Sequence, residues 1–393
     1  MRRYDAIIAG GGVAGLTLAH SLVQSRLHDR SLLVIDQDAA GHDDHSLSYW
    51  SRQPMPFDAV VRQSWDTLRV TTGGRERVIG LGPYRYRTLR ARDFTCLIRR
   101  ELAAHPNVDV VTSVVERLDD GAEYAQAVAG GARYEGRWIF DSRWATPAHS
   151  PYPQLYYDAR QSFAGAVIAA AAGAFDPSAV TFLDFRTSQR DGVRFFYVLP
   201  YSPHRAFIEY VALDADPPDR KQYQQALREY VETVLGITAY RVVAEEHGTS
   251  PMTDRPFPRR LGQRIMAIGA LGGRIKPSSG FGITRIARDS AAIVQSLACY
   301  GHPFAVPPDP WRYRLYDSLL MEMVAHDPAA IERVFGALFA RNPIERVFQF
   351  LDETGSLWAN IRLIATMPPW TALRALPRAK VWRRLCRYGA AGC

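Results

Sequence analysis

The sequence predicts an α/β fold whose first part is built on a parallel sheet. An apolar run over residues 4–9 leads into a Gly-x-Gly-x-x-Gly pattern and then into a helical pattern. A second apolar run, residues 31–35, follows and ends at Asp36. The three glycines of the pattern are Gly10, Gly12 and Gly15. Strand, glycine turn, helix, strand and terminal acid in this order indicate a dinucleotide-binding turn.

Each residue of this turn has a distinct expected role. Gly10 permits the tight turn, Gly12 lets the backbone approach a pyrophosphate, and Gly15 allows the helix to pack closely on the strand. The free N–H groups of the helix that begins near Ala14 face the pyrophosphate. Asp36, about 20 residues downstream, is the acid that binds a ribose hydroxyl.

The next segments extend the nucleotide-binding part. The chain is expected to be irregular over residues 45–50, and an amphipathic helix is predicted over residues 91–102. Short strands are predicted over residues 108–115 and 124–128. A further apolar strand ends at Asp141, where an acid beside the nucleotide fold suits binding of flavin adenine dinucleotide (FAD). A simple strand-end turn explains Asp141 equally well.

Residues 150–260 have a different, β-rich pattern. Two apolar runs, 195–200 and 205–213, flank a turn and predict an antiparallel hairpin. Residues 264–273 return to the nucleotide-binding sheet, and the helix after residues 278–282 offers a second N-terminus, suited to the flavin end. From Trp311 the pattern is mostly helical.

We therefore predict a Rossmann-like FAD-binding domain of the glutathione-reductase/hydroxylase type with an inserted substrate domain. The FAD-binding domain comprises residues 1–150 and 260–300, the β-rich substrate domain residues 150–260, and the helical region residues 301–393.

Charge and composition restrict the partners. The net charge is +8, and no nucleic-acid-binding motif is present, so anionic lipid is the expected surface. The four cysteines lack metal-ligand spacing, so no metal is expected. The most apolar segment, residues 163–175, is shorter than the ~20 residues that span a bilayer. No cationic leader precedes the first strand, so we expect a cytoplasmic protein that contacts a membrane peripherally.

The C-terminal residues 370–387 contain basic side chains and no acidic ones. With Trp370 and Trp382 they are typical of an interfacial membrane anchor. A solvated basic tail is the alternative.

Several segments together resemble the bacterial lycopene beta-cyclases, flavoproteins of carotenoid biosynthesis. The most specific is a Gly-Gly-x-x-Lys-Pro-x-x-Gly motif, and the least specific is the N-terminal glycine pattern. The resemblance also includes residues 140–143, 161–163, 183–186, 196–200, 207–209, 316–317 and 350–353. It implies that FAD is held by the turn residues and Asp36, and by Asp141, Gly272, Gly273, Pro277 and Gly280.

The activity that the resemblance implies is cyclisation of the linear ends of lycopene to beta-rings, towards beta-carotene. The reaction has no net redox change: an acid protonates an end-group alkene, a carbocation forms, and a neighbouring proton is lost. Reduced FAD is the active form in this family, and NADPH or NADH serves as the external reductant. The substrate places the protein at the inner face of the cell membrane.

Glu209 is the candidate acid. Alkenes are very weak bases, so the acid has to be neutral and enclosed in a dry pocket, where desolvation raises a glutamate above its usual pKa of about 4.3. Glu209 lies on a strand of aromatic and aliphatic residues, whose rings could stabilise the cation. A surface glutamate on a two-faced strand is the alternative interpretation.

One position departs from the family pattern. Relatives commonly carry a second acid directly after the motif glutamate, where this chain has Tyr210. Neighbouring side chains on a strand face opposite ways, so residues 209 and 210 cannot point at one substrate atom. The replacement weakens a mechanism with two adjacent carboxylates and leaves a single-acid mechanism intact.

Two other functions fit the same fold. A redox flavoprotein (hydroxylase, halogenase or prenyl reductase) is the first, but hydroxylases usually have Gly-Asp where this chain has Gly269-Ala270, and Asp-Gly where it has Asp141-Ser142. A prenyl-binding chaperone without activity is the second. The sequence leaves open whether one or both ends of the substrate cyclise.

Overall fold

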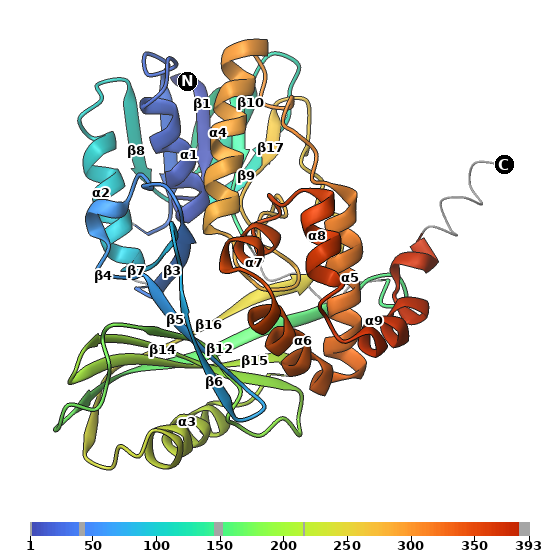
Figure 1. The fold of residues 1–393 in the computed structure, drawn as a ribbon. Coiled ribbons are helices and arrows are strands. Elements are labelled where there is room, and N and C mark those ends of the chain that lie inside the picture. The colour runs from blue at the N-terminus through green and yellow to red at the C-terminus, as the bar shows by residue number, and fades with distance from the viewer. Residues whose placement is uncertain (1, 39–43, 145–151, 215–216, 385–393) are drawn as a thin grey trace.

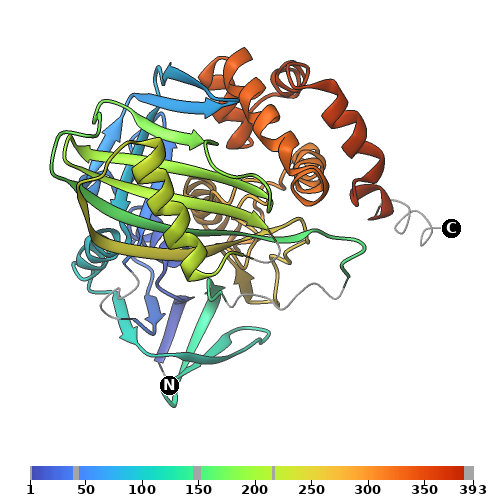
Figure 2. The ribbon, with the colours of Figure 1, turned by 90° about the horizontal axis from the view of Figure 1, so that it is seen from below.

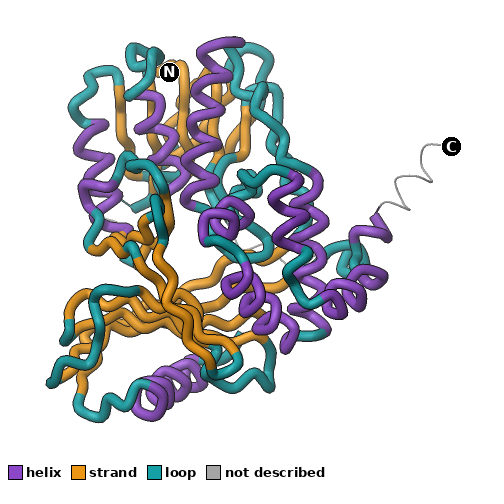
Figure 3. The backbone as a smooth tube through the Cα atoms, in the orientation of Figure 1, coloured by secondary structure: helices purple, strands orange, loops and turns teal. Residues whose placement is uncertain are grey.

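Two large sheets and a group of C-terminal helices make up the molecule (Figure 1). The computed structural model describes residues 2–38, 44–144, 152–214 and 217–384. The first sheet and its helices lie at one end, the second sheet at the other, and the C-terminal helices beside both (Figure 1). The tube view shows helices in front of the first sheet, and a single helix on the outer face of the second (Figure 3).

The first sheet has the order β8-β2-β1-β11-β10-β9, and β17 pairs with β11. The pairs among β1, β2, β8, β11 and β17 are parallel, while β9, β10 and β11 form an antiparallel meander. Its strands are β1 (Arg2–Ala9), β2 (Leu32–Asp36), β8 (Val108–Thr112), β9 (Val115–Asp119), β10 (Ala125–Ala129), β11 (Ala132–Asp141) and β17 (Ile265–Ala267). The return of residues 265–267 to this sheet is as expected from the sequence.

Three helices pack on this sheet. They are α1 (Val13–Val23), α2 (Ala91–Leu102) and α4 (Ile283–Tyr300). Their apolar faces share one buried core with β1 and β2, and this core includes Leu18, Leu97 and Ile293. Helix α4 ends at Gly301, whose φ of 71° is the left-handed conformation that glycine adopts without strain.

The second sheet has the order β16-β12-β15-β14-β13-β5-β6 and is antiparallel except between β13 and β5. Its strands are β5 (Thr67–Thr72), β6 (Arg75–Gly80), β12 (Asp158–Ala170), β13 (Val180–Asp184), β14 (Val193–Ser202), β15 (Arg205–Asp214) and β16 (Tyr240–Thr253). The first eight residues of the apolar segment 163–175 thus lie in β12, and its last five follow that strand. The predicted hairpin is β14–β15. Helix α3 (Arg220–Glu229), followed by a π-helical turn over Tyr230–Val234, lies across the outer face (Figure 2).

Two features of residues 1–150 differ from the expectation. Strands β5 and β6 belong to the second sheet, so this range does not form one continuous unit. Residues 45–50, expected to be irregular, lie mostly in strand β3 (Ser46–Ser51) of a small sheet with β7 (Arg85–Arg90) and β4 (Gln63–Trp65). Residues 46–51 form a strand because they pair with β7, about 40 residues later in the sequence. No local sequence pattern marks a pairing between such distant segments. A short 3-10 turn, Asp58–Val60, precedes β4.

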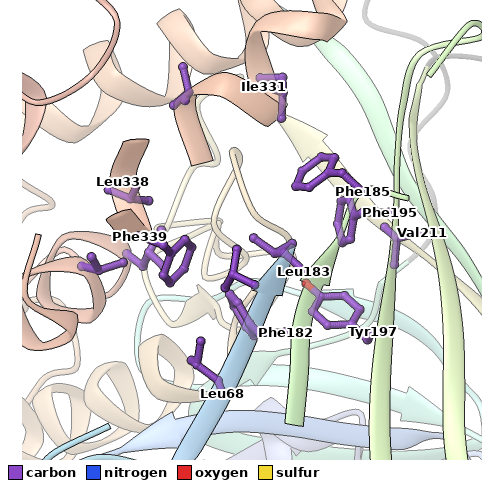
Figure 4. Close-up of a cluster of buried hydrophobic side chains, with 14 of the residues drawn as sticks. Leu68, Phe182, Leu183, Phe185, Phe195, Tyr197, Val211, Ile331, Leu338 and Phe339 are labelled. Atoms are coloured by element: carbon purple, nitrogen blue, oxygen red, sulfur yellow. The ribbon is translucent and has the colours of Figure 1, made fainter. Parts of the chain in front are cut away.

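The C-terminal region is helical from Trp311, as the sequence predicts. Its elements are α5 (Trp311–His326), α6 (Pro328–Arg341), α7 (Ile344–Leu351), α8 (Leu357–Ile364), α9 (Pro369–Ala375) and a 3-10 turn (Leu376–Arg378). Helix α6 packs on the inner face of the second sheet, where Ile331, Leu338 and Phe339 meet Phe182 and Leu68 (Figure 4). Within the described ranges, no helix is both long and apolar enough to cross a bilayer.

Candidate active site

The glycine turn after β1 leaves open space where a phosphate group would approach. Gly10 has a φ of 103°, and Gly12 is the N-cap of α1 with no side-chain cap. A Cβ atom on Gly12 would meet no atom within 4 Å, whereas a Cβ on Gly15 would lie 2.0 Å from the Gly10 carbonyl oxygen. Gly15 therefore serves close packing of α1 on the turn, while the space beside Gly12 is free to admit a ligand.

Asp36 lies at the end of β2 directly beside this turn. A Cβ atom on Gly11 would come within 2.6 Å of the Asp36 carboxylate. The same carboxylate accepts a hydrogen bond of 2.7 Å from Arg99 on α2 and remains partly accessible. The geometry fits a carboxylate fixed at the edge of a nucleotide site, and its ribose contact stays a prediction.

The residues at the end of β11 have contacts that differ from those expected. The Asp141 carboxylate forms a two-pronged ion pair with Arg143, at 2.8 and 2.9 Å. It is Ser142 whose hydroxyl donates to the Gly10 carbonyl oxygen, at 2.9 Å. Ser142 therefore ties the end of β11 to the glycine turn, a contact that the sequence analysis did not identify. The Asp141 carbonyl oxygen accepts a hydrogen bond from the Ile268 backbone N–H, which joins the end of β11 to the segment after β17.

The Gly-Gly-x-x-Lys-Pro-x-x-Gly segment forms the loop between β17 and α4. Gly273 and Gly280 have φ values of 71° and 70°, and a Cβ on Gly280 would collide with the side chain of Gln161 on β12. A Cβ on Gly272 would lie 2.6 Å from the Ala267 carbonyl oxygen. Glycine is required here because the loop packs tightly against both sheets. Gly272, Gly273 and Pro277 also line a cavity of ≈ 450 Å³, together with residues of α5 and the C-terminal segment.

Lys276 of this loop is buried in a cluster of ions. Its amino group donates to Asp317 on α5 at 2.7 Å and to Glu353 after α7 at 2.9 Å, and Glu353 also pairs with Arg285 on α4. Burial lowers the pKa of Lys276, but the two carboxylates outweigh it and raise that pKa above its ordinary value. Glu353 has a φ of 61°, which is uncommon outside glycine. The cluster fixes the loop to the C-terminal helices.

Glu209 lies at the centre of the second sheet, on its inner face. On β15 it stands opposite Tyr197 of β14 and Gly165 of β12. Burial, with a smaller contribution from the charge of Glu246, raises the pKa of Glu209 to about 8. In the part of the chain that the structure describes, no side chain donates a hydrogen bond to its carboxyl group. Desolvation without compensating donors favours the protonated form.

Tyr210 points the other way, to the outer face of the sheet. Its ring lies 4.9 Å from that of Phe196 and 5.6 Å from that of Tyr223 on α3. Residue 210 is thus a buried core residue beneath α3. The opposite orientation of residues 209 and 210 is as the strand geometry predicts.

Aromatic rings cluster on the Glu209 side of the second sheet. Trp50 lies 4.5 Å from Phe281 and 4.9 Å from Phe348, and Phe182 lies 5.6 Å from Tyr86 and from Tyr197, between ring centroids. Phe182 and Tyr197 belong to the same buried cluster as Phe195 (Figure 4). Of the rings considered from the sequence, Phe195, Tyr197 and Phe207 are on this side, whereas Phe196 and Tyr210 are not.

Five of these rings were not identified from the sequence. They are Trp50, Tyr86, Phe182, Phe281 and Phe348, and they come from β3, β7, β13, the loop before α4 and α7, which only the fold brings together. Because Phe281 directly follows Gly280, the aromatic cluster joins the expected flavin loop to the strand that carries Glu209.

The C-terminal segment attaches to the body of the protein. The amino group of Lys380 donates to the Pro153 and Tyr156 carbonyl oxygens, and Arg384 pairs with Asp254 at 2.8 Å. The most exposed apolar side chains of the helical region include Trp311, Trp358 and Trp370, each more than 70% exposed. Part of the basic stretch is therefore engaged internally, and residues 385–387 lie outside the described residues.

A family model described as lycopene cyclase protein matches residues 5–377. The chain is 24% identical over 317 residues to a chloroplastic lycopene beta cyclase of Arabidopsis thaliana, covering 75% of this chain but only 60% of that protein. A lycopene beta-cyclase of Pantoea ananas is 23% identical over 394 residues and matches at nearly full length, 95% and 97% of the two chains.

Solved structures share the fold at low sequence identity. A flavoprotein/dehydrogenase from Cytophaga hutchinsonii superposes with a TM-score of 0.62 at 13% identity, covering 91% of this chain and 94% of the other. The fold is thus shared with a solved flavoprotein, and it combines a first, mostly parallel sheet with a β-rich second sheet and a helical C-terminal region, as predicted.

Proposed function

The chain belongs to the lycopene cyclase family, and we propose that it is a lycopene beta-cyclase that converts the linear ends of lycopene to beta-rings with reduced FAD bound. The observation that carries the proposal is the position of Glu209, whose side chain lies on the inner face of the second sheet opposite Tyr197 and beside a cluster of aromatic rings, where burial raises its pKa to about 8. A neutral carboxylic acid at physiological pH is what protonation of an alkene requires.

The residues of this face support protonation of the substrate and stabilisation of the cation. Glu209 donates its proton to the terminal alkene and leaves a cation on the more substituted carbon. An internal alkene attacks that carbon, the new carbon–carbon bond closes the ring, and the charge moves to the other carbon of the attacking alkene. Loss of the proton from the ring carbon next to it forms the ring alkene. One proton enters and one leaves, so no electrons are transferred overall. Ring faces such as those of Tyr197 and Phe182 each stabilise a cation by about 0.5–2 kcal/mol, and they exclude water that would capture it.

The residues near the glycine turn fit FAD. Gly10, Gly12 and the uncapped N-terminus of α1 would hold the pyrophosphate, Asp36 the ribose, and the loop over residues 272–280 the flavin end. Reduced flavin, when bound, supplies an electron-rich ring beside the cation, and NADPH or NADH is its external reductant in this proposal. The loop that would hold the flavin end continues into Phe281, whose ring contacts Trp50 in the aromatic cluster on the Glu209 side.

The test of the proposed function is conversion of lycopene. Expression in a lycopene-accumulating bacterium is expected to replace lycopene with ring-bearing carotenoids, resolved by pigment chromatography. Products with one ring and two rings elute separately, so the same experiment decides how many ends react. Unchanged lycopene beside folded, FAD-loaded protein would favour a binding protein, and hydroxylated or hydrogenated pigment would favour a redox flavoprotein.

The lipid-soluble substrate supports a further part of the proposal, contact with the inner face of the cell membrane. Exposed apolar residues on α8 and α9 include Trp358, Ile361 and Trp370, with Arg362 and Arg374 on the same helices. Tryptophan beside basic residues is typical of an interfacial surface. Two further tryptophans, Trp311 and Trp382, lie outside these helices and line the ≈ 450 Å³ cavity that also touches Gly272 and Pro277.

Removal of two exposed tryptophans should weaken membrane binding. We expect the double variant Trp358→Ser, Trp370→Ser to bind anionic vesicles about tenfold or more weakly in sedimentation, because each ring loses apolar burial in the headgroup region. The matched control is Tyr300→Ser at the end of α4, also exposed (66%) but on the nucleotide-binding part. Equal sedimentation of the double variant and the control would reject α8 and α9 as the membrane surface.

A further inference from the structure

A second glutamate lies on the same row of the sheet as Glu209. Gly165 on β12 stands opposite Glu209 on one side and opposite Glu246 of β16 on the other. Directly opposed residues in antiparallel strands share a face, so both glutamates point to the inner side. Two strand spacings separate their Cα atoms by about 10 Å. Gly165 contributes no side chain between them, and the ring of Phe207 occupies the space that a Cβ there would need.

Glu246 is held in place by an arginine and a backbone N–H group. Its carboxylate accepts a 2.6 Å hydrogen bond from Arg90, at the end of β7, and two of 3.1 Å from the Ser46 backbone N–H. Arg90 also pairs with Asp44, at 3.2 Å. Two carboxylates therefore share one guanidinium, and the group of three carries one net negative charge. The Glu246 side chain is only 7% exposed, which limits screening of that charge by water.

We propose that Glu246 is a positioning residue of the reaction: its fixed carboxylate keeps the proton on Glu209 until the substrate takes it. The inference rests on the proposed role of Glu209 as the acid. It assigns a second carboxylate on the face of Glu209 to β16, two places away from β15 in the sheet. Glu246 itself is not the proton donor in this proposal, because its carboxyl oxygens accept hydrogen bonds from Arg90 and from the Ser46 backbone N–H.

The sign of the effect follows from the groups around Glu209. Those that face it are Tyr86 from β7, Tyr197 from β14 and Glu246 from β16, and burial keeps both tyrosines neutral by raising their pKa values. The groups around Glu246 include Arg90, Asp44 and Tyr201, and Arg62, which pairs with Asp93, lies near Asp44 and Tyr201. A negative charge opposes ionisation of Glu209, so its removal lowers the pKa of Glu209 and shifts loss of activity to lower pH.

The test compares the pH dependence of cyclisation by the FAD-loaded protein, with the flavin kept reduced and lycopene in vesicles. Wild-type activity is expected to fall as pH rises through about 8. For Glu246→Gln we expect this fall about one pH unit lower, so the variant is about fivefold less active than the wild type at pH 8 and nearly equal at pH 6. Glu246→Asp should restore the wild-type curve. Glu245→Gln, an exposed neighbour on the same strand, is the matched control and should leave the curve unchanged.

The inference would be overturned if the pH–activity curve of Glu246→Gln coincided with that of Glu245→Gln, or if Glu246→Gln lost the same fraction of activity at pH 6 as at pH 8. If Glu246→Gln is inactive, infrared titration of the substrate-free protein decides instead. The C=O band of protonated Glu209, identified by its absence in Glu209→Gln, should disappear at lower pH in the variant, and an unmoved band would overturn the inference. An active Glu209→Gln would reject the proposed function itself, whereas an inactive Glu209→Gln beside an unmoved curve rejects only the role of Glu246.

Discussion

Replacement of Glu209 by glutamine is expected to reduce cyclisation by about 10²–10⁴-fold, the usual contribution of a general acid. Glutamine keeps the shape of the side chain and lacks the transferable proton. Because burial raises the pKa of Glu209 from its ordinary 4.5 to about 8, the wild type should lose stability relative to the glutamine variant as pH rises from about 4.5 to 8, and the variant should stay the more stable protein above that range. FAD content should stay at the wild-type level, since Glu209 lies on β15, outside the glycine turn. Activity is measured as ring-bearing pigment formed per bound flavin.

The control for this variant is Tyr210→Phe on the same strand. Residue 210 packs between Phe196 and Tyr223 on the outer face, so loss of its hydroxyl should leave activity within a few-fold of the wild type. Full activity of Glu209→Gln would remove Glu209 as the acid. A loss of activity in Tyr210→Phe as large as that in Glu209→Gln would mean that the fold of the strand, rather than the carboxyl group, limits the reaction.

The second large effect is expected at the glycine turn. Substitution of Gly12 should prevent cofactor binding, whereas substitution of Gly15, three residues later, should destabilise the fold. Gly12 has φ −73° and ψ −172°, a conformation open to any residue, and no atom lies within 4 Å of a Cβ built there. Gly12→Val should therefore fold with normal stability yet be purified without colour, since its side chain fills the space for the pyrophosphate. The measurement is flavin absorbance per protein, together with thermal unfolding.

Gly15→Ala is the matched comparison. Its Cβ would lie 2.0 Å from the Gly10 carbonyl oxygen, so we expect a loss of stability of at least about 2 kcal/mol from overpacking, whether or not flavin is bound. Normal flavin content in Gly12→Val would contradict the cofactor assignment. Equal destabilisation by both substitutions would contradict the view that Gly12 faces a ligand and Gly15 faces the protein.

The elements with strong local patterns were predictable from the sequence. The first strand, its glycine turn and α1 follow from an apolar run and three glycines, and α2 from its amphipathic period, with the same bounds, Ala91–Leu102. The β14–β15 hairpin follows from two apolar runs around a turn. The opposite directions of Glu209 and Tyr210 required only the two-residue period of a strand.

What the sequence could not predict depends on long-range pairing. Ser46–Ser51 is a strand because β7 pairs with it, and the same pairing brings Arg90 to Glu246, 156 residues away. Strands β5 and β6 join a sheet whose other members come after residue 157. The ion cluster of Lys276 unites the loop before α4 with α5 and the end of α7, and no local period marks such partners.

The most direct test of redox-neutral, acid-initiated cyclisation is the balance of protons and electrons in deuterated water. The donor carboxyl exchanges with solvent, so each ring formed should carry one deuterium, detected by mass spectrometry of the pigment. Once the flavin is reduced, ring formation should proceed without stoichiometric oxidation of NADPH or NADH. One nicotinamide oxidised per ring, or rings formed without deuterium, would contradict this account.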